Sequence, residues 1–164
     1  MDPYSTHLPI LKNIIDNTDI KSVFEFGSGL HSTQLFAENC DDVITCDIDE
    51  EWYNTISDKF KDYKNVSPIL HKDHEWGSKT PESIAYLKQL NRRFDLIFID
   101  CGDAPTRPHC VNAASKFTDL IIAHDTDAPA VIGYNWHLVE LKEPEWRRTD
   151  YKDVVPWTTV WERM

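Results

Sequence analysis

Several features that would assign a chain to a special class are scarce or missing in this sequence. Five glycines and nine prolines in 164 residues are too few for a low-complexity or linker protein. No apolar run approaches the roughly 20 residues that span a bilayer. Residues 1–7 lack the basic and apolar regions of a signal peptide. We therefore expect a cytoplasmic protein without a membrane partner.

Cysteine pairs are also missing. The four cysteines form no C-x-x-C motif, which argues against a paired-cysteine zinc site and against a thioredoxin-type redox centre. We expect free thiols at Cys40, Cys46, Cys101 and Cys110.

Basic residues are in deficit. The chain has 17 lysines and arginines against 28 acidic residues, which gives a net charge of −11 at pH 7. Such a charge repels phosphate backbones on average. The sequence therefore predicts a small-molecule substrate and no nucleic-acid partner, and it leaves the oligomeric state open.

What is present is the pattern of one folded α/β domain, expected over residues 1–164. Short apolar runs alternate with segments of helical period, which is typical of buried parallel strands joined by helices. The predicted fold is a Rossmann-like, doubly wound, mostly parallel sheet. The expected strands are 22–26, 43–47, 66–70, 94–100 and 119–123, and the expected helices are 8–17, 32–39, 50–60, 81–91 and 107–116.

The pattern changes near the end of the chain. Two β-prone runs, 146–151 and 156–162, flank a short connection and predict a closing antiparallel hairpin. Alternation places Trp157 and Trp161 on one face, where we expect them to pack in the core.

A glycine turn follows the first expected strand. In a doubly wound sheet, ligands bind at the carboxyl ends of the strands, so residues at these ends are the candidates for a site. The turn reads Glu25-Phe26-Gly27-Ser28-Gly29, and its glycines let the backbone come close to a ligand before a helix begins. Two glycines also suit a simple tight turn, so this signal needs support from its surroundings.

Acidic residues follow the next two strands. Asp47 ends the second strand, where a carboxylate can accept hydrogen bonds from both hydroxyls of a ribose. Asp49 is the better N-cap for the helix that follows. After the third strand, Asp73 is a candidate for the adenine amino group and Trp76 for stacking on its ring, although an ordinary surface loop explains this segment equally well.

Together these segments resemble the class I S-adenosylmethionine (SAM)-dependent methyltransferases. The resemblance covers nearly the whole chain and rests on the glycine turn, Asp47 and the run 94–100. In that family the glycine turn holds the methionine portion of SAM, the acid after the second strand holds the ribose, and the next loop holds the adenine. The resemblance implies that SAM is bound by Glu25, Gly27, Ser28, Gly29, Asp47, Asp73 and Asp100.

The segment 121–126 resembles the HDT segment of small O-methyltransferases that have divalent-metal sites. This implies that Asp100, His124 and Asp125 bind Mg²⁺ or a similar ion, which would lower the pKa of an acceptor hydroxyl. An imidazole is a poor ligand for Mg²⁺, so His124 is alternatively the general base. A third interpretation is that His124 and Asp125 merely cap the following segment.

Further candidates lie close to these residues in the expected topology. Arg107 is placed to hold an acidic substrate through a bidentate contact. The segment Tyr4 to His7 can fold over the cofactor in this topology. The remaining secondary candidates are His31, Asp103 and His109.

The predicted function is methyl transfer from SAM to a hydroxyl of a small molecule or sugar, catalysed by Asp100, His124 and Asp125. A non-catalytic nucleoside-binding domain of the same fold is the main alternative. A nicotinamide oxidoreductase is weaker, because the third glycine of G-x-G-x-x-G is missing. A nucleic-acid methyltransferase is disfavoured by the net charge and by the lack of an N/D-P-P-Y/F segment.

Overall fold

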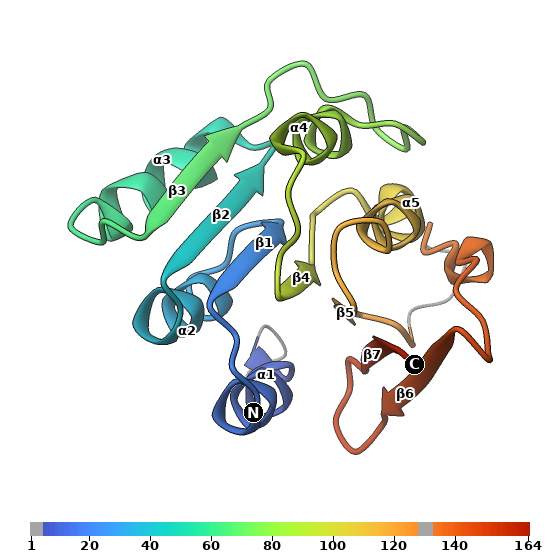
Figure 1. Ribbon diagram of the computed structural model, residues 1–164. Coiled ribbons are helices and arrows are strands. Elements are labelled where there is room, and N and C mark those ends of the chain that lie inside the picture. The colour runs from blue at the N-terminus through green and yellow to red at the C-terminus, as the bar shows by residue number, and fades with distance from the viewer. Residues whose placement is uncertain (1–4, 128–132) are drawn as a thin grey trace.

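The computed structural model describes residues 5–127 and 133–164. Its strands form one sheet in the order β3-β2-β1-β4-β5-β7-β6 (Figure 1). Strands β1 to β5 are parallel, and β7 runs antiparallel to both β5 and β6. This confirms the predicted Rossmann-like fold with a C-terminal antiparallel hairpin. The strands are β1 Ser22–Phe26, β2 Asp42–Asp47, β3 Val66–Leu70, β4 Leu96–Ile99, β5 Leu120–His124, β6 Trp146–Tyr151 and β7 Thr158–Arg163.

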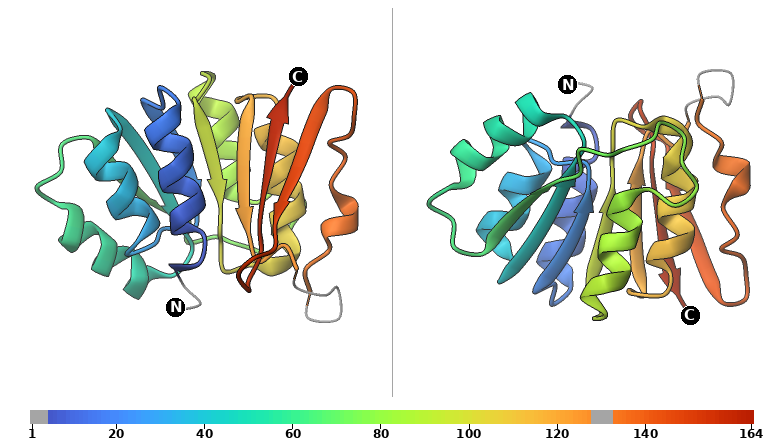
Figure 2. Two further views of the ribbon diagram at one scale, coloured as in Figure 1. Left: turned by 90° about the horizontal axis from the view of Figure 1, so that it is seen from below. Right: turned by 90° about the horizontal axis from the view of Figure 1, so that it is seen from above.

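Helices cover both faces of the sheet, as Figure 2 shows from opposite sides. One apolar cluster joins α1, α2 and α3 to one face, and a second cluster joins α4 and α5 to the other. The central strands are therefore apolar on both faces, which explains their continuous apolar runs. The helices are α1 Leu8–Asn17, α2 Ser32–Asn39, α3 Glu50–Phe60, α4 Glu82–Leu90 and α5 Arg107–Ala114, with short 3₁₀ turns η2 Ala104–Thr106 and η4 Trp136–Leu138.

Local chemistry sets the ends of several elements. The Asp49 side chain accepts a hydrogen bond from the Trp52 amide at 2.7 Å, which confirms Asp49 as the N-cap of α3. Helix α5 ends at Ala114, two residues earlier than expected, because the amides of Lys116 and Phe117 donate to carbonyls three residues back. None of the described helices is long and apolar enough to cross a membrane.

The two tryptophans of the last strand region behave differently from each other. Trp161 is 1% exposed and lies in the core, as predicted. Trp157 is half-buried and precedes β7, because its amide donates to Asp127 instead of joining the ladder. The expectation that both indoles are core residues is therefore wrong for Trp157.

Candidate functional site

A cavity of about 1120 Å³ opens at the carboxyl ends of the parallel strands. The strand order reverses between β1 and β4, and in open α/β sheets such a reversal creates the ligand crevice. The volume exceeds the roughly 300–1,000 Å³ of ordinary small-molecule sites, so the cavity has room for a cofactor and an acceptor. The predicted residues that line it are Gly27, Ser28, Gly29, Asp47, Asp100, His124 and Asp125.

Two predicted cofactor residues do not line this cavity. Glu25 is fully buried beneath it, and its carboxyl group accepts hydrogen bonds from Ser32 Oγ at 2.5 Å and Thr33 Oγ1 at 2.6 Å. Glu25 therefore holds the first turn of α2. Asp73 is exposed, because the loop turns inward one residue later, where His74 Nε2 lies 2.7 Å from a buried carboxylate.

Gly27 is required by the close approach of two strands. Its φ is +88°, and a Cβ there would lie 2.5 Å from Cys101 Cα and 2.6 Å from the Asp100 carbonyl oxygen. A side chain at this position would force apart the ends of β1 and β4. The glycine thus brings the turn after β1 next to Asp100.

The amides of the glycine turn are all engaged within the protein. Gly27 N donates to Cys46 O, Ser28 N to Asp47 Oδ2, and Gly29 N to Thr33 Oγ1. The turn therefore offers a ligand close backbone approach rather than free N–H donors.

Asp47 connects the glycine turn to the end of β2. Its Oδ2 accepts hydrogen bonds from the amide and the hydroxyl of Ser28, and its Oδ1 accepts from the amides of Ile48 and Asp49. Each carboxylate oxygen thus already accepts two hydrogen bonds. A ribose hydroxyl has to share these oxygens or replace the Ser28 hydroxyl, which donates at 2.7 Å.

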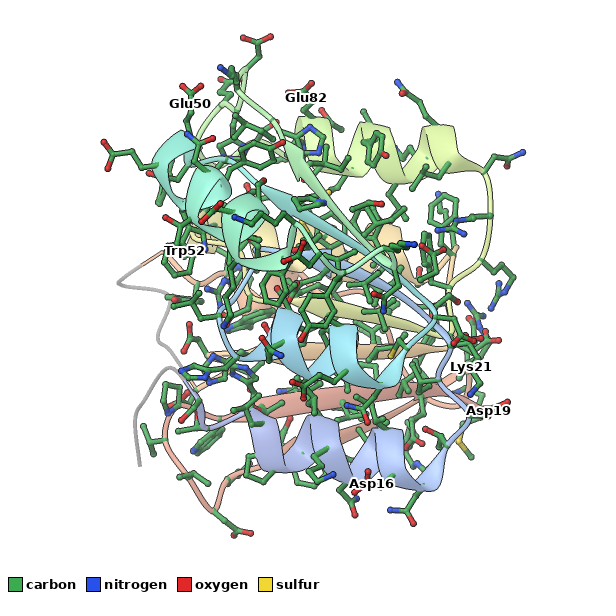
Figure 3. The ribbon with its side chains drawn as sticks, turned by 90° about the vertical axis from the view of Figure 1, so that its left-hand side faces the viewer. Asp16, Asp19, Lys21, Glu50, Trp52 and Glu82 are labelled. Atoms are coloured by element: carbon green, nitrogen blue, oxygen red, sulfur yellow. The ribbon has the colours of Figure 1, made fainter. Side chains whose placement is uncertain are left out.

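Trp52 is a lining residue that the sequence reasoning missed. Its indole N–H donates to the Ser28 carbonyl at 2.8 Å and braces the glycine turn from α3. Figure 3 shows Trp52 at one end of the sheet and Asp19 and Lys21, which precede β1, at the other. An aromatic residue in the first turn of a helix carries no distinctive pattern, so the sequence offered no signal for this contact.

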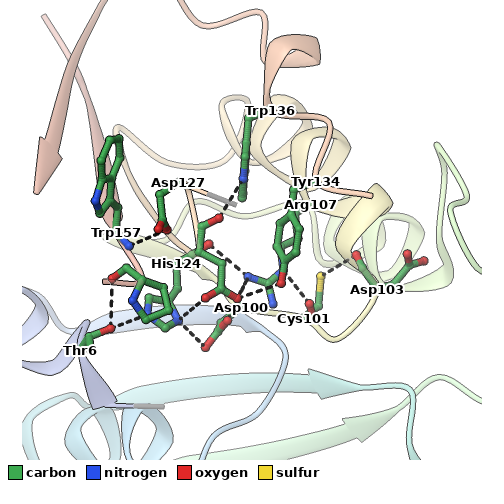
Figure 4. Close-up of polar contacts among 12 residues, drawn as sticks. Thr6, Asp100, Cys101, Asp103, Arg107, His124, Asp127, Tyr134, Trp136 and Trp157 are labelled. Atoms are coloured by element: carbon green, nitrogen blue, oxygen red, sulfur yellow. Dashed lines mark hydrogen bonds and ion pairs between the residues drawn. The ribbon is translucent and has the colours of Figure 1, made fainter. Parts of the chain in front are cut away.

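A buried arginine organises the opposite side of the cavity (Figure 4). Arg107 is 4% exposed, and its Nη1 lies 3.1 Å from Asp100 Oδ1 and 2.9 Å from Asp125 Oδ2. The same group donates to the His124 carbonyl, and its Nε donates to the Cys101 carbonyl. Nε and Nη1 of Arg107 thus contact groups within the protein, while Arg107 also lines the cavity, and its contact with an acidic substrate stays a prediction.

The charge of Asp100 follows from these contacts. Burial alone would raise the pKa of Asp100, but a hydrogen bond with His124 and the positive charge of Arg107 outweigh it, so the pKa lies below its ordinary value. Asp100 is therefore an anion at neutral pH.

Two buried histidines meet beside Asp100. His124 Nε2 lies 2.7 Å from Thr6 Oγ1, and His124 Nδ1 lies 3.4 Å from Asp100 Oδ2 and 3.6 Å from Asp125 Oδ1. The His7 ring packs edge-on against His124 with centroids 4.6 Å apart. Burial lowers the pKa of His7 to about 4, although Asp100 acts in the opposite direction, so His7 is neutral at pH 7.

The N-terminal segment does reach the site, through Thr6 and His7. His7 and His31, both secondary candidates, line the cavity. Tyr4 lies outside the described residues.

The residues within metal-ligand reach differ from the predicted set. Within 5–127 and 133–164, one group of His, Cys, Asp or Glu side chains has all its ligand atoms within 4.8 Å of one another, and it consists of His7, Asp100 and His124. Asp125 is not in this group. Its carboxylate is turned toward Arg107 and accepts a hydrogen bond from the Tyr134 hydroxyl at 3.0 Å.

Two secondary candidates stand apart from the cavity. Asp103 is 1% exposed and accepts hydrogen bonds from the Gly77 amide and the Thr106 hydroxyl, so it holds a loop together. His109 lies on α5 and does not line the cavity.

Glu25 is expected to make stability depend on pH. Burial raises its pKa to about 7 from an ordinary 4.5, although hydrogen bonds from Ser32 and Thr33 oppose the shift. Because the folded-state pKa is raised, the protonated carboxyl stabilises the fold below pH 4.5, and this contribution is lost as the pH rises through 7.

We therefore expect the free energy of unfolding of the wild type, relative to Glu25→Gln, to fall by about 2 kcal/mol between pH 5 and pH 8. Urea unfolding of both proteins across this range measures the difference. Glu51→Gln, an exposed change on α3, is the control and should leave the pH dependence unchanged. Parallel curves for wild type and Glu25→Gln would contradict the raised pKa.

Known structures share this architecture over most of the chain, although no protein-family model and no curated protein sequence matches it. A Streptococcus mutans protein assigned as a methyltransferase, in complex with S-adenosylhomocysteine (SAH), is 11% identical over 96% of this chain and 97% of its own, with a TM-score of 0.68. An rRNA methylase from Streptococcus thermophilus is 14% identical over 93% of each chain, with a TM-score of 0.62. A Pyrococcus horikoshii protein assigned as an RNA methyltransferase is 15% identical over 95% of this chain and 80% of its own, with a TM-score of 0.55.

These comparisons correct the expectation about partners. The sequence-based prediction excluded a nucleic-acid partner because of the negative net charge. However, structures named as RNA or rRNA methyltransferases share this fold. The exclusion is wrong because net charge averages the whole surface, whereas a nucleic acid contacts one local surface. At these sequence identities the likeness shows the fold alone, a Rossmann-like α/β fold that this chain shares with structures named as methyltransferases.

Proposed function

We propose that this chain is a SAM-dependent methyltransferase. The observation that carries the proposal is the cavity at the reversal of strand order, lined by the glycine turn and Asp47, in a fold that a similar structure uses with SAH bound. The glycine-turn end would hold SAM, and the end at Asp100 and His124 would receive the acceptor.

The charges that line the cavity fit a cationic cofactor. Four carboxylates line the cavity. The guanidinium of Arg107 also lines it, and two of these carboxylates already pair with this guanidinium. Acidic walls attract positively charged ligands. When bound, SAM supplies a methyl group on a positively charged sulfur. The lining carboxylates are Asp47, Asp49, Asp100 and Asp125.

The glycine-turn end would position the cofactor mainly through shape. The turn is fixed by Asp47 on one side and by the Trp52 indole on the other. Its internally satisfied amides leave Gly27 and Gly29 as a close-approach surface. Holding the methyl donor and the acceptor in a fixed alignment can supply much of the reduction in the activation barrier.

The opposite end would receive a hydroxyl group. Asp100 is anionic and partly exposed to the cavity, and the His124 ring lies beside it. These groups can orient a hydroxyl and favour loss of its proton as a new bond forms at its oxygen. We propose O-methylation for this reason. The hydroxyl of a small molecule, a sugar or an RNA ribose fits this chemistry.

Ligand binding tests the cofactor assignment. We expect SAM and SAH to raise the melting temperature, with about 2.7 kcal/mol of stabilisation at 100 times the dissociation constant, and NAD to cause no shift. Asp47→Asn should weaken SAH binding at least tenfold, because it releases the Ser28 hydroxyl that holds the turn. Asp62→Asn, an exposed acid outside the cavity, is the matched control.

The possible outcomes separate the alternatives. Absence of any shift with SAM and SAH would refute the proposal, and a shift with NAD alone would support an oxidoreductase. If SAM binds, transfer of a radiolabelled methyl group should be measured on a panel of phenols, sugars and RNA. Binding without transfer to any acceptor would favour the non-catalytic alternative.

A further inference from the structure

His7 is a buried polar side chain whose ring nitrogens have no hydrogen-bond partner. The side chain is 2% exposed, and among the residues that the structure describes neither Nδ1 nor Nε2 is paired. Its ring lies between Phe98, with centroids 5.1 Å apart, and His124. Buried polar groups are nearly always paired, so an imidazole in this position calls for a ligand.

The hydrogen bonds of Thr6 orient the neighbouring ring. Thr6 Oγ1 donates to the Pro156 carbonyl at 3.2 Å. When the Thr6 hydrogen is on Pro156, the Thr6 oxygen accepts from His124 Nε2–H, 2.7 Å away. Figure 4 shows Thr6 on one side of the His124 ring and Asp100 on the other.

In this arrangement the second nitrogen of His124 faces negative charge. Nδ1 lies 3.4 Å from Asp100 Oδ2 and 3.6 Å from Asp125 Oδ1, and in the neutral ring with its hydrogen on Nε2 it carries the lone pair that a metal would use. A proton on Nδ1 would instead point to Asp100, and a bound metal would replace that proton. His124 Nδ1, the Asp100 carboxylate and the unpaired His7 ring therefore form a set of ligand groups that suits a shared cation.

We propose that His7, Asp100 and His124 bind a divalent first-row transition metal at the inner end of the cavity. Their ligand atoms lie within 4.8 Å of one another, and all three residues line the cavity. Two imidazoles and one carboxylate suit Zn²⁺, Fe²⁺, Co²⁺ or Ni²⁺ and disfavour Mg²⁺, which prefers oxygen ligands. This ligand set replaces the magnesium trio expected from the sequence.

The surrounding charges leave room for such a cation. Asp100 and Asp125 carry two negative charges and share one positive charge on Arg107. Arg107 contacts Asp100 Oδ1, which leaves Oδ2 directed at His124 Nδ1. Thr6 would act as an outer-shell partner that fixes the orientation of the His124 ring.

Such a metal would sit where the acceptor is proposed to bind. A cation with open positions toward the cavity lowers the pKa of a hydroxyl that it contacts. This role in methyl transfer rests on the proposed function, whereas the metal site itself does not.

Metal titration of the full chain tests the site. Tag-free protein is stripped with a chelator and then titrated with Zn²⁺ by calorimetry and with Co²⁺ by visible absorption. We expect one equivalent to bind, with Mg²⁺ binding more weakly. His7→Gln should weaken Zn²⁺ and Co²⁺ binding at least tenfold, and His137→Gln, at an exposed histidine outside the cavity, should not.

Each outcome decides the inference. Lack of stoichiometric Zn²⁺ and Co²⁺ binding would overturn it, as would unchanged affinity in His7→Gln. Circular dichroism melting checks that each variant is folded. If His7→Gln does not fold, His124→Gln is used as the second variant of a proposed ligand. SAH titration is run in parallel. SAH binding without metal binding refutes the metal site alone, and metal binding without SAH binding refutes the proposed function alone.

Discussion

Replacing Arg107 with methionine is expected to lower the free energy of unfolding by about 3–5 kcal/mol at pH 7. Methionine keeps an apolar stem of similar length but leaves Asp100 and Asp125 without their shared cation. It also removes the donors to two carbonyl oxygens, those of Cys101 and His124. Urea unfolding monitored by circular dichroism measures the loss.

The deficit of Arg107→Met should shrink on acidification. The wild-type pKa of Asp100 is held low, so its contribution to stability is present above the ordinary value of 3.8 and is lost as the pH falls through the folded-state pKa. Without Arg107 that pKa rises, and protonation then relieves the unpaired charge. Arg147→Met is the control, because Arg147 forms an exposed pair with Glu162 and should cost less than about 1 kcal/mol. Equal losses in the two variants would contradict the central role of Arg107.

Gly27→Ala is expected to destabilise the protein by about 3–4 kcal/mol, from a strained backbone and an overpacked contact together. Alanine at φ +88° is strained, and its Cβ would lie 2.5 Å from Cys101 Cα, where both partners are backbone and cannot turn away. Thermal and urea unfolding measure the effect.

Gly102→Ala is a closely matched control for this change. Gly102 also lines the cavity, but a Cβ there meets nothing within 4 Å. We expect its stability to stay within about 0.5 kcal/mol of wild type. If Gly27→Ala were equally harmless, the close approach of β1 and β4 would not be the reason for this glycine.

Sequence patterns predicted the sheet well because its elements are locally determined. Strands such as Leu96–Ile99 are apolar on both faces, and helices such as Glu50–Phe60 follow a capping acid. These are short-range signals that survive in the folded chain. The topology rule then placed Asp47 and Asp100 at the same edge, where the cavity lies.

The direction in which side chains point was not predictable in the same way. Arg107 turns inward because its guanidinium pairs with Asp100 and Asp125, which follow the ends of two different strands. One Asp125 oxygen contacts Arg107, and the other lies 3.6 Å from His124 Nδ1. His7 joins the site through a contact with a strand more than a hundred residues away. No periodicity records such pairings, since they depend on how separate elements pack.

The Thr6 hydroxyl bonds to partners 118 and 150 residues away. During synthesis this end of the cavity therefore cannot form until Pro156 has been added and the long loop has closed. In the finished protein, α1 has Leu11 as its fully buried residue, so local opening of this helix can dismantle the site while the sheet stays folded. A ligand that contacts His7 would then also have to stabilise α1 in its folded position. The free energy needed to keep α1 folded would therefore reduce the measured binding affinity.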